Sequence, residues 1–356
     1  MQDLEVALSP PYPVRLRREF TAAWAALRTD HPQRRLFVVA DRRVLRQQPD
    51  ALAGLDPEER EQVVELEGGE RIKSLRYLDA LVGRALKARV DRRSLVVAVG
   101  GGTLGDLVGF FAATYMRGVD WCPLATTVVS LADAAVGGKT AVNCNGLKNL
   151  VGAFHQPVGV YGALEALHSL PRRHRMAGLA EVVKCGLIAD AGLFELLERR
   201  AGELSQAGGE IWAEALHRSV QVKAGVVAED PEERGRREVL NFGHTLGHAL
   251  EATLHPALHH GEAVALGMLA ALHVGRGRGL GGDDLLPRVE SLLERLGLPT
   301  RHRGIDVAST MEAVGYDKKV WDRQVRMVLT ERIGSATVGH AVDRAEMSRA
   351  LQALLA

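Results

Sequence analysis

The chain has 356 residues, of which 46% are hydrophobic and 25% charged, and this length and composition are typical of a globular protein of about two domains. Its 45 basic and 44 acidic residues leave a net charge of +1. A near-neutral chain has no overall attraction to nucleic acid or to an anionic membrane, so we expect neither partner.

The cysteines and the N-terminal residues indicate in which cellular compartment the protein is expected. The three cysteines lack CxxC spacing, which favours a reducing compartment over a disulfide framework. The first twenty residues contain no apolar run typical of a signal peptide, and no apolar stretch is long enough to span a membrane. We therefore expect a cytoplasmic protein.

The first half of the chain alternates between strand and helix patterns. Short apolar runs at residues 34–41, 94–99 and 122–129 are typical of buried parallel strands, and residues 74–90 have a helical pattern. This alternation predicts an α/β, Rossmann-like nucleotide-binding domain over residues 1–170.

Helical periodicity dominates the second half. It is clear at residues 179–190, 213–229 and 261–277, and the main strand candidate is 324–338. We therefore predict a second, mostly α-helical domain over residues 171–356.

A glycine-rich turn follows the strand predicted at 94–99. In VVAVGGGTLGDL, Gly100, Gly102 and Gly105 have GxGxxG spacing between a strand and a helix, where the backbone can approach a pyrophosphate. The usual fingerprint has its acidic residue on the next strand, whereas the best strand-end acid here, Asp41, precedes the glycines. We interpret the turn as a nicotinamide-dinucleotide site of unusual layout. The alternative is an ordinary tight turn.

A second glycine-rich segment, GGKTAVNCNGLKNLVGAF, carries two lysines. Lys139 follows a glycine pair, and Lys148 and Asn149 come nine residues later. The segment is not a P-loop, because Asp133 stands where that motif needs a glycine. We expect a loop that binds an anionic, hydroxylated ligand, although a solvated loop would have the same composition.

Histidines cluster in the helical half. In LNFGHTLGHALE, His244, His248 and Glu251 fall on one helix face. Two histidines and a carboxylate with an open fourth position describe a catalytic zinc site, but a polar helix face has the same spacing. Spacing does not choose among the candidate ligands, which are His244, His248, His255, His259, His260 and Glu181.

Other charged residues in this half have weaker signals. Glu181 lies in an apolar helical pattern with Lys184 one turn on, so it needs a cationic partner, either a lysine or a metal. Lys223, Arg237, Lys318 and Lys319 are each more typical of a surface charge, and only a fold that gathers them would give them a role.

Taken together, these motifs resemble the 3-dehydroquinate synthase family of sugar phosphate cyclases. The resemblance extends from about Asp41 to Val338 and is carried, in order, by GGERIKSL, GGGTLGDLVGFFAATYMRG, TTVVSLADAAVGGKTAVN, KNLVGAFHQP, GLAEVVK, ERGRREVLNFGHTLGHALE, HHGEAV and DKKV. No single segment is decisive, but the ordered set is highly specific. It implies a dehydroquinate synthase-like fold.

The resemblance implies a lyase of the shikimate pathway of aromatic amino acid biosynthesis. Such an enzyme converts 3-deoxy-D-arabino-heptulosonate 7-phosphate (DAHP) to 3-dehydroquinate and phosphate. The family reaction proceeds through transient oxidation by NAD, phosphate elimination, reduction and an intramolecular aldol step.

The resemblance also implies roles for individual residues. Family metal ligands, for Zn²⁺ or alternatively Co²⁺, fall on Glu181, His244 and His260. Catalytic positions fall on His248, Lys139, Lys184, Arg237 and Asn241. Contacts to the sugar phosphate fall on Asp133, Lys148, Asn149, Lys223, Lys318 and Lys319, with Arg117 supplied by the neighbouring subunit of a homodimer. NAD contacts fall on Asp41, Glu70, Lys73, Gly101, Gly102, Asp106, Thr126 and Thr127.

The sequence departs from the family pattern at a few positions, which are Ala125, Ala134, Ala135, Leu147, Gly162 and His174. None of them is an implied metal or phosphate contact, but related cyclases make other rings from similar sugar phosphates. His248 favours dehydroquinate synthase, because this histidine is typically replaced in the valiolone-forming relatives.

Two further functions compete with a cyclase. A metal- and NAD-dependent alcohol or glycerol dehydrogenase shares the two-domain plan. Such dehydrogenases lack the anion-binding lysines and usually have aspartate at the position of Glu181. A non-catalytic, metal-stabilised binding module would leave Lys139, Lys148 and Arg237 unexplained.

Overall fold

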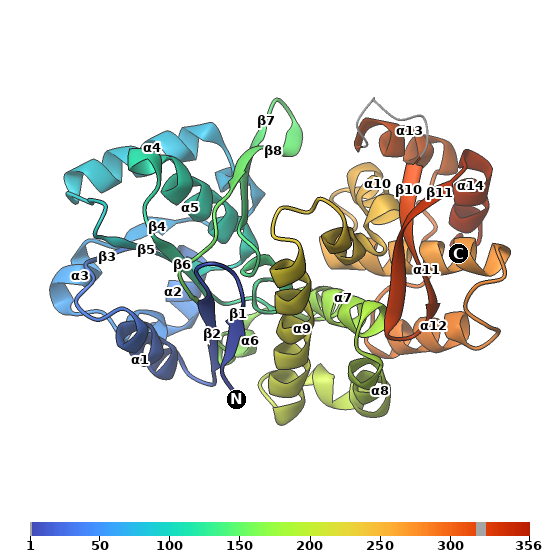
Figure 1. Ribbon diagram of the computed structural model, residues 1–356, viewed down its shortest axis with the longest axis horizontal. Coiled ribbons are helices and arrows are strands. Elements are labelled where there is room, and N and C mark those ends of the chain that lie inside the picture. Colours follow the sequence, from blue (N-terminus) through green and yellow to red (C-terminus); the bar gives the residue numbers. More distant parts are fainter. Residues whose placement is uncertain (1, 318–324) are drawn as a thin grey trace. The chain divides into compact units, whose positions relative to one another are not determined.

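The computed structural model describes residues 2–317 and 325–356 (Figure 1). Contacts divide the chain into a first unit, Met1–Pro171 with Trp212–Pro231, and a second unit, Arg172–Ile211 with Glu232–Ala356. The sequence pattern placed 212–231 in the second domain. In the structure this segment packs with the first unit, where the Lys223 ammonium donates to the carboxylate of Asp133. A helical periodicity cannot indicate which of two cores a helix joins.

A seven-stranded sheet forms the first unit, in the order β1-β2-β9-β6-β5-β3-β4. The strands are β1 (Leu4–Val6), β2 (Tyr12–Arg17), β3 (Leu36–Asp41), β4 (Val64–Leu66), β5 (Leu95–Gly100), β6 (Trp121–Ala125) and β9 (Val160–Ala163). β1 and β2 pair antiparallel, and the other neighbours are parallel. The strands predicted at 34–41 and 94–99 are β3 and β5. The run at 122–129 is a strand only as far as Ala125.

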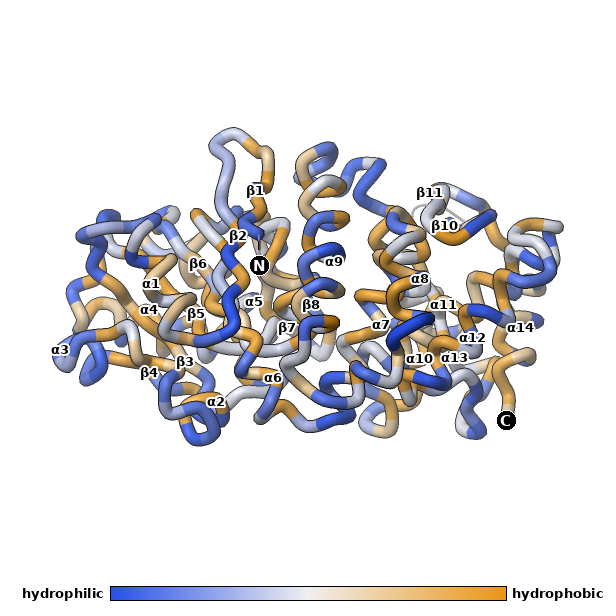
Figure 2. The backbone as a smooth tube through the Cα atoms, turned by 90° about the horizontal axis from the view of Figure 1, so that it is seen from below, coloured by the Kyte–Doolittle hydropathy of each residue, from blue (hydrophilic) through white to orange (hydrophobic). Residues whose placement is uncertain are grey.

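Helices cover the sheet of the first unit. They are α1 (Phe20–Asp30), α2 (Arg42–Gln47), α3 (Pro57–Glu61), α4 (Leu75–Lys87), α5 (Gly102–Thr114) and α6 (Ala166–Ser169). Most of α9 (Glu210–Glu229) also belongs to this unit. Short helical turns are η1 (Pro49–Leu52), η2 (Glu70–Ile72), η3 (Tyr115–Arg117) and η4 (Ser130–Ala134). Hydrophobic and hydrophilic residues are interspersed along α9, as expected for a helix that is buried on one side and solvated on the other (Figure 2).

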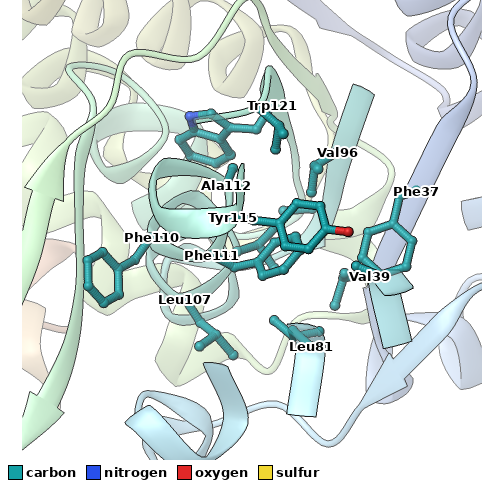
Figure 3. Packing of buried hydrophobic residues seen from close by; sticks show 14 of the residues in the cluster. Phe37, Val39, Leu81, Val96, Leu107, Phe110, Phe111, Ala112, Tyr115 and Trp121 are labelled. Carbon is teal, nitrogen blue, oxygen red and sulfur yellow. The ribbon is translucent and has the colours of Figure 1, made fainter. Parts of the chain in front are cut away.

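Alternate residues of the buried strands enter two different cores. On β3, Phe37 and Val39 pack with side chains of α4 and α5, whereas Leu36 and Val38 pack with the core that contains α1. The rings of Phe111 and Tyr115 stack at 5.1 Å in the first of these cores (Figure 3). A strand directs successive side chains to opposite faces, so continuous apolar runs are what a sheet covered on both faces requires.

The second glycine-rich segment is an antiparallel hairpin, β7 (Lys139–Cys144) and β8 (Leu147–Phe154). We expected a loop, and this expectation was wrong. Asn145 and Gly146 both have positive φ, at 51° and 78°, and an Asn-Gly pair is the preferred two-residue turn between antiparallel strands. Lys139 therefore lies on β7, and Lys148 and Asn149 lie on β8.

The second unit is mostly helical, as predicted. Its helices are α7 (Arg172–Ile188), α8 (Ala191–Arg200), α10 (His244–Leu254), α11 (His260–Gly277), α12 (Leu285–Arg295), α13 (Val307–Asp317) and α14 (Arg344–Gln352), with short turns η5 (Ala201–Ser205) and η6 (Arg236–Asn241). The strand candidate at 324–338 forms, within the described residues, a hairpin of β10 (Val325–Arg332) and β11 (Ser335–Val342). No described helix combines the length and apolar character needed to cross a membrane.

Candidate functional site

Glu181 is a buried carboxylate on α7. Only 1% of its surface is exposed, and α7 is buried continuously from Met176 to Ile188. Lys184, one turn further and equally buried, brings its Nζ to 2.5 Å from Glu181 Oε2. The ammonium compensates part of the cost of burying this carboxylate. The other oxygen, Oε1, faces two histidines.

His244 and His260 stand at the first positions of α10 and α11. Their Nε2 atoms lie 3.5 Å and 3.2 Å from Glu181 Oε1, and one donor atom from each of the three residues fits within 4.8 Å of the others. Across the described ranges, this is the only such group of three metal-ligating side chains. The ring of His259, another candidate, instead lies 4.6 Å from that of His174.

Both imidazoles are held through their Nδ1 atoms. His244 Nδ1 lies 3.1 Å from the carbonyl oxygen of Phe242, and His260 Nδ1 lies 3.0 Å from Glu251 Oε2. A carbonyl can only accept, so His244 Nδ1 carries the proton and its Nε2 keeps a lone pair toward Glu181. Two imidazole nitrogens and one carboxylate oxygen are the donor set of a catalytic zinc site, and Co²⁺ accepts the same ligands.

The surroundings shift the pKa values of the two histidines in opposite directions. Burial opposes ionisation of Glu181, but Lys184 and the histidines hold its pKa well below the usual range. Burial and Lys184 lower the pKa of His244. Burial acts in the same direction on His260, yet its hydrogen bonds to Glu181 and Glu251 raise that pKa to about 10. The carboxylates of Glu181 and Glu251 thus stabilise a positive charge in this cluster.

The other predicted residues of the second unit lie near this cluster in the chain. The His248 ring is 5.1 Å from that of His244 and 5.8 Å from that of His260, so three imidazoles are neighbours. Asn241 donates from Nδ2 to Glu233 Oε1 at 2.9 Å, and Arg237 is 1% exposed. Gly243, between η6 and α10, has a left-handed φ of 77°, which lets His244 begin the helix. Lys318 and Lys319 lie outside the described residues.

Residues of the predicted nucleotide site gather at one edge of the sheet in the first unit. Asp41 ends β3, Gly101 follows β5 and caps α5, and Thr126 and Thr127 follow β6. Adjacent parallel strands bring their carboxyl ends to the same edge, where α/β folds bind nucleotides. A Cβ atom on Gly100 would lie 3.5 Å from that of Asp41. Asp41, which precedes the glycines in the sequence, therefore lies beside them in the fold.

A polar network joins this edge to the β7–β8 hairpin. Lys73 is 5% exposed and donates from Nζ to Asp106 Oδ2 at 2.5 Å and to Asn149 Oδ1. Asn143 donates to Glu70 Oε1 at 2.7 Å and accepts from the backbone N–H of Asn149 at 2.9 Å. Hydrogen bonds thus connect Glu70, Lys73 and Asp106, which we predicted to contact NAD, with Asn149, which we predicted to contact substrate.

The remaining predicted contacts of the first unit differ in exposure. Lys223 is 6% exposed, and its Nζ donates to both the carbonyl oxygen and Oδ1 of Asp133, each at 2.6 Å. Lys139, Lys148 and Arg117 are exposed. Asn143 and Glu251 were assigned no role in the sequence analysis. The signal for Glu251 was its place on the same helix face as His244 and His248, and for Asn143 the sequence offered none.

Comparison with known proteins decides the family. A family model described as 3-dehydroquinate synthase N-terminal matches residues 63–177, and one described as 3-dehydroquinate synthase C-terminal matches residues 178–320. A 3-dehydroquinate synthase of Synechococcus sp. is 42% identical over 293 residues, which are 81% of this chain and 80% of that protein. The chain belongs to the 3-dehydroquinate synthase family. The family and the fold class inferred from the sequence are therefore confirmed.

Solved structures agree with membership of the 3-dehydroquinate synthase family. The 2-epi-5-epi-valiolone synthase of Streptomyces hygroscopicus subsp. jinggangensis 5008, solved with NAD⁺ and Zn²⁺ bound, is 29% identical with a TM-score of 0.87 over 96% of each chain. A 2-deoxy-scyllo-inosose synthase solved with carbaglucose-6-phosphate, NAD⁺ and Co²⁺ has a TM-score of 0.88 at 23% identity, over 99% of this chain and 100% of that one. The second likeness shows a shared fold.

Proposed function

We propose that the protein is a 3-dehydroquinate synthase, a lyase that converts DAHP to 3-dehydroquinate and phosphate in the shikimate pathway. The observation that carries the proposal is the Glu181, His244 and His260 cluster in a chain of this family. None of the described cysteines forms a disulfide, which is consistent with the cytoplasmic location we also propose. Fractionation of the source cells would test that location.

We propose zinc and NAD as the cofactors, with cobalt as an alternative metal. The Streptomyces valiolone synthase binds NAD⁺ and Zn²⁺ and supports this proposal. Glu181, His244 and His260 would hold the metal, and Asp41, Glu70, Lys73, Gly101, Gly102, Asp106, Thr126 and Thr127 would bind the dinucleotide. When bound, NAD takes and returns a hydride, and the metal polarises the hydroxyl group that is oxidised.

Side chains of the protein would bind the sugar phosphate and move protons. Lysines suit a phosphate as point charges, and an arginine can bind it through two parallel hydrogen bonds. We assign phosphate and hydroxyl contacts to Asp133, Lys148, Asn149, Lys223, Lys318, Lys319 and Arg117, and catalytic contacts to Lys139, Lys184, Arg237, Asn241 and His248. Arg237 is buried, and its guanidinium group offers several N–H donors in a planar arrangement that suits an anion.

The assay that tests the function is phosphate release from DAHP by the purified protein, with NAD present and with or without a chelator. We expect chelator-sensitive release, 3-dehydroquinate as the product and no net NADH, because the family reaction returns its hydride. Absence of release from DAHP, with release from another sugar phosphate, would assign a different cyclase. Steady NADH formation from a simple polyol would instead indicate a dehydrogenase.

We further propose a homodimer in which Arg117 acts in the partner's site. Support comes from the surface of the first unit, where Leu147 on β8 is 54% exposed and Leu150 and Phe154 are 56% and 49% exposed. Leu150 and Phe154 lie four residues apart and so on the same face of the strand. Large exposed apolar side chains gathered on one hairpin are typical of an association surface.

Subunit complementation tests this arrangement. Arg117→Ala and His244→Ala variants should each be inactive alone, whereas their co-expression should restore about a quarter of the wild-type rate. The reason is that half of the dimers are mixed, and one of the two sites in each mixed dimer has both residues. If Arg117 acts within its own chain, no mixed dimer is active. A monomer in sedimentation velocity would also contradict the proposal.

A further inference from the structure

Glu251, in the last turn of α10, touches a proposed metal ligand without belonging to the ligand set. Its Oε2 lies 3.0 Å from His260 Nδ1, on the side of the imidazole opposite to Nε2, which faces Glu181. Its side chain is 14% exposed, so the contact is largely screened from water. A glutamate in such a place acts on the metal only through the histidine.

The two proposed histidine ligands differ in what holds them. His244 is held by a neutral carbonyl group, that of Phe242, and its side chain is 12% exposed. His260 is 37% exposed, so packing holds it less firmly than His244. A hydrogen bond to a carboxylate is roughly twice as strong as one between neutral groups. Glu251 thus provides the stronger hydrogen bond where packing is weaker.

The charges lead to the same conclusion. Lys184 lies 2.5 Å from Glu181 and offsets its charge, so Glu181 alone presents little net charge to a divalent cation. Glu251 adds a second carboxylate next to the cluster without occupying a coordination position. A carboxylate on the outer nitrogen also makes the inner nitrogen a better donor.

We propose that Glu251 is a positioning residue: it accepts a hydrogen bond from the Nδ1–H group of His260, directs the Nε2 lone pair toward the metal position, and strengthens metal binding. This inference rests on the proposed ligand set of Glu181, His244 and His260. It concerns a residue that we assign neither to the metal ligands nor to the substrate contacts. The consequence is a metal affinity that depends on a side chain outside the ligand set.

The test measures zinc affinity by competition with a chelating dye, and the visible absorption of the Co²⁺-substituted protein. Glu251→Ala should weaken zinc binding by about 10- to 100-fold and shift the Co²⁺ bands, because His260 loses the acceptor that fixes its ring. Glu251→Gln should retain part of the affinity, since its amide oxygen can still accept from Nδ1. Because glutamine has nearly the size of glutamate, a difference in zinc affinity between Glu251→Gln and Glu251→Ala reports the lost hydrogen bond together with the lost side-chain volume, and a difference between Glu251→Gln and the wild type reports the lost charge alone.

Glu198→Gln is the matched control. This carboxylate of the same unit accepts from Arg288 Nε at 3.1 Å and Nη2 at 2.6 Å, so its loss removes an ion pair away from the proposed ligands. It should leave zinc affinity and the Co²⁺ spectrum unchanged. The thermal midpoints of the metal-free variants show whether any of them has lost its fold.

Two outcomes separate this inference from the ligand assignment. A Glu251→Ala protein that binds zinc as tightly as the wild type, with the same Co²⁺ spectrum, would overturn the positioning role and leave the ligands in place. If His260→Ala also binds zinc like the wild type, the ligand set itself is wrong, and the inference fails with it.

Discussion

His244→Ala is expected to abolish stoichiometric zinc binding and to lower the rate of phosphate release from DAHP by about a thousandfold or more. Removing one of three protein ligands leaves a two-ligand site, and a bound metal contributes several kcal/mol to stabilising developing charge. Each 1.4 kcal/mol corresponds to about a tenfold change in rate. The measurements are metal content after dialysis and the phosphate-release assay.

Arg237→Ala is the informative comparison for that variant. Arg237 is fully buried in η6, a few residues before His244, so its loss perturbs the same region. Because we assign it to the catalytic contacts with substrate, the variant should keep its zinc and lose turnover. Zinc loss in both variants would point to general disruption. Full zinc retention by His244→Ala would show that His244 is not a ligand.

The sequence pattern alone did not predict which histidines lie beside Glu181. Helical spacing placed His244 and His248 on one face, but it favoured neither over His255, His259 or His260 as a ligand. The residues that meet Glu181 come from the starts of two different helices, and the intervening turn decides which imidazole faces the carboxylate. Only the resemblance to a family selected His260, because local periodicity carries no information about contacts between helices.

The sheet was predictable for the opposite reason. β3 and β5 are buried on both faces, so burial leaves a continuous apolar run in the sequence. The β7–β8 hairpin has no such signature, since β8 is largely exposed and its sequence, LKNLVGAF, is neither a continuous apolar run nor a regular alternation of apolar and polar residues. Its one local signal was the Asn145-Gly146 turn. The position of α9 was equally hidden, because it depends on contacts such as that of Lys223 with Asp133.

Gly261→Ala is expected to destabilise the second unit and to weaken zinc binding at the same time. A Cβ atom at Gly261 would lie 1.8 Å from the carbonyl oxygen of Ala177, far inside any contact distance. That oxygen belongs to the backbone of α7, one turn before Glu181, so no side-chain rotation can relieve the clash. α7 and α11 would have to move apart, and His260, the neighbour of Gly261, would move away from Glu181.

The expected cost is about 2 kcal/mol or more, which for a unit of this size is roughly 4–8 °C in the thermal midpoint of the metal-free protein. We also expect zinc affinity to fall by at least about tenfold, because small displacements of a ligand are costly to a metal site. Thermal unfolding and chelator competition measure the two effects.

Gly277→Ala, at the end of the same helix, is the control. A Cβ atom there meets nothing within 4 Å, and alanine favours the helix over glycine, so stability should be unchanged or higher by up to about 1 kcal/mol. If the two variants behave alike, the close approach of α7 and α11 does not hold Glu181 and His260 together. If only Gly261→Ala loses zinc affinity, the metal centre depends on a contact in which no ligand takes part.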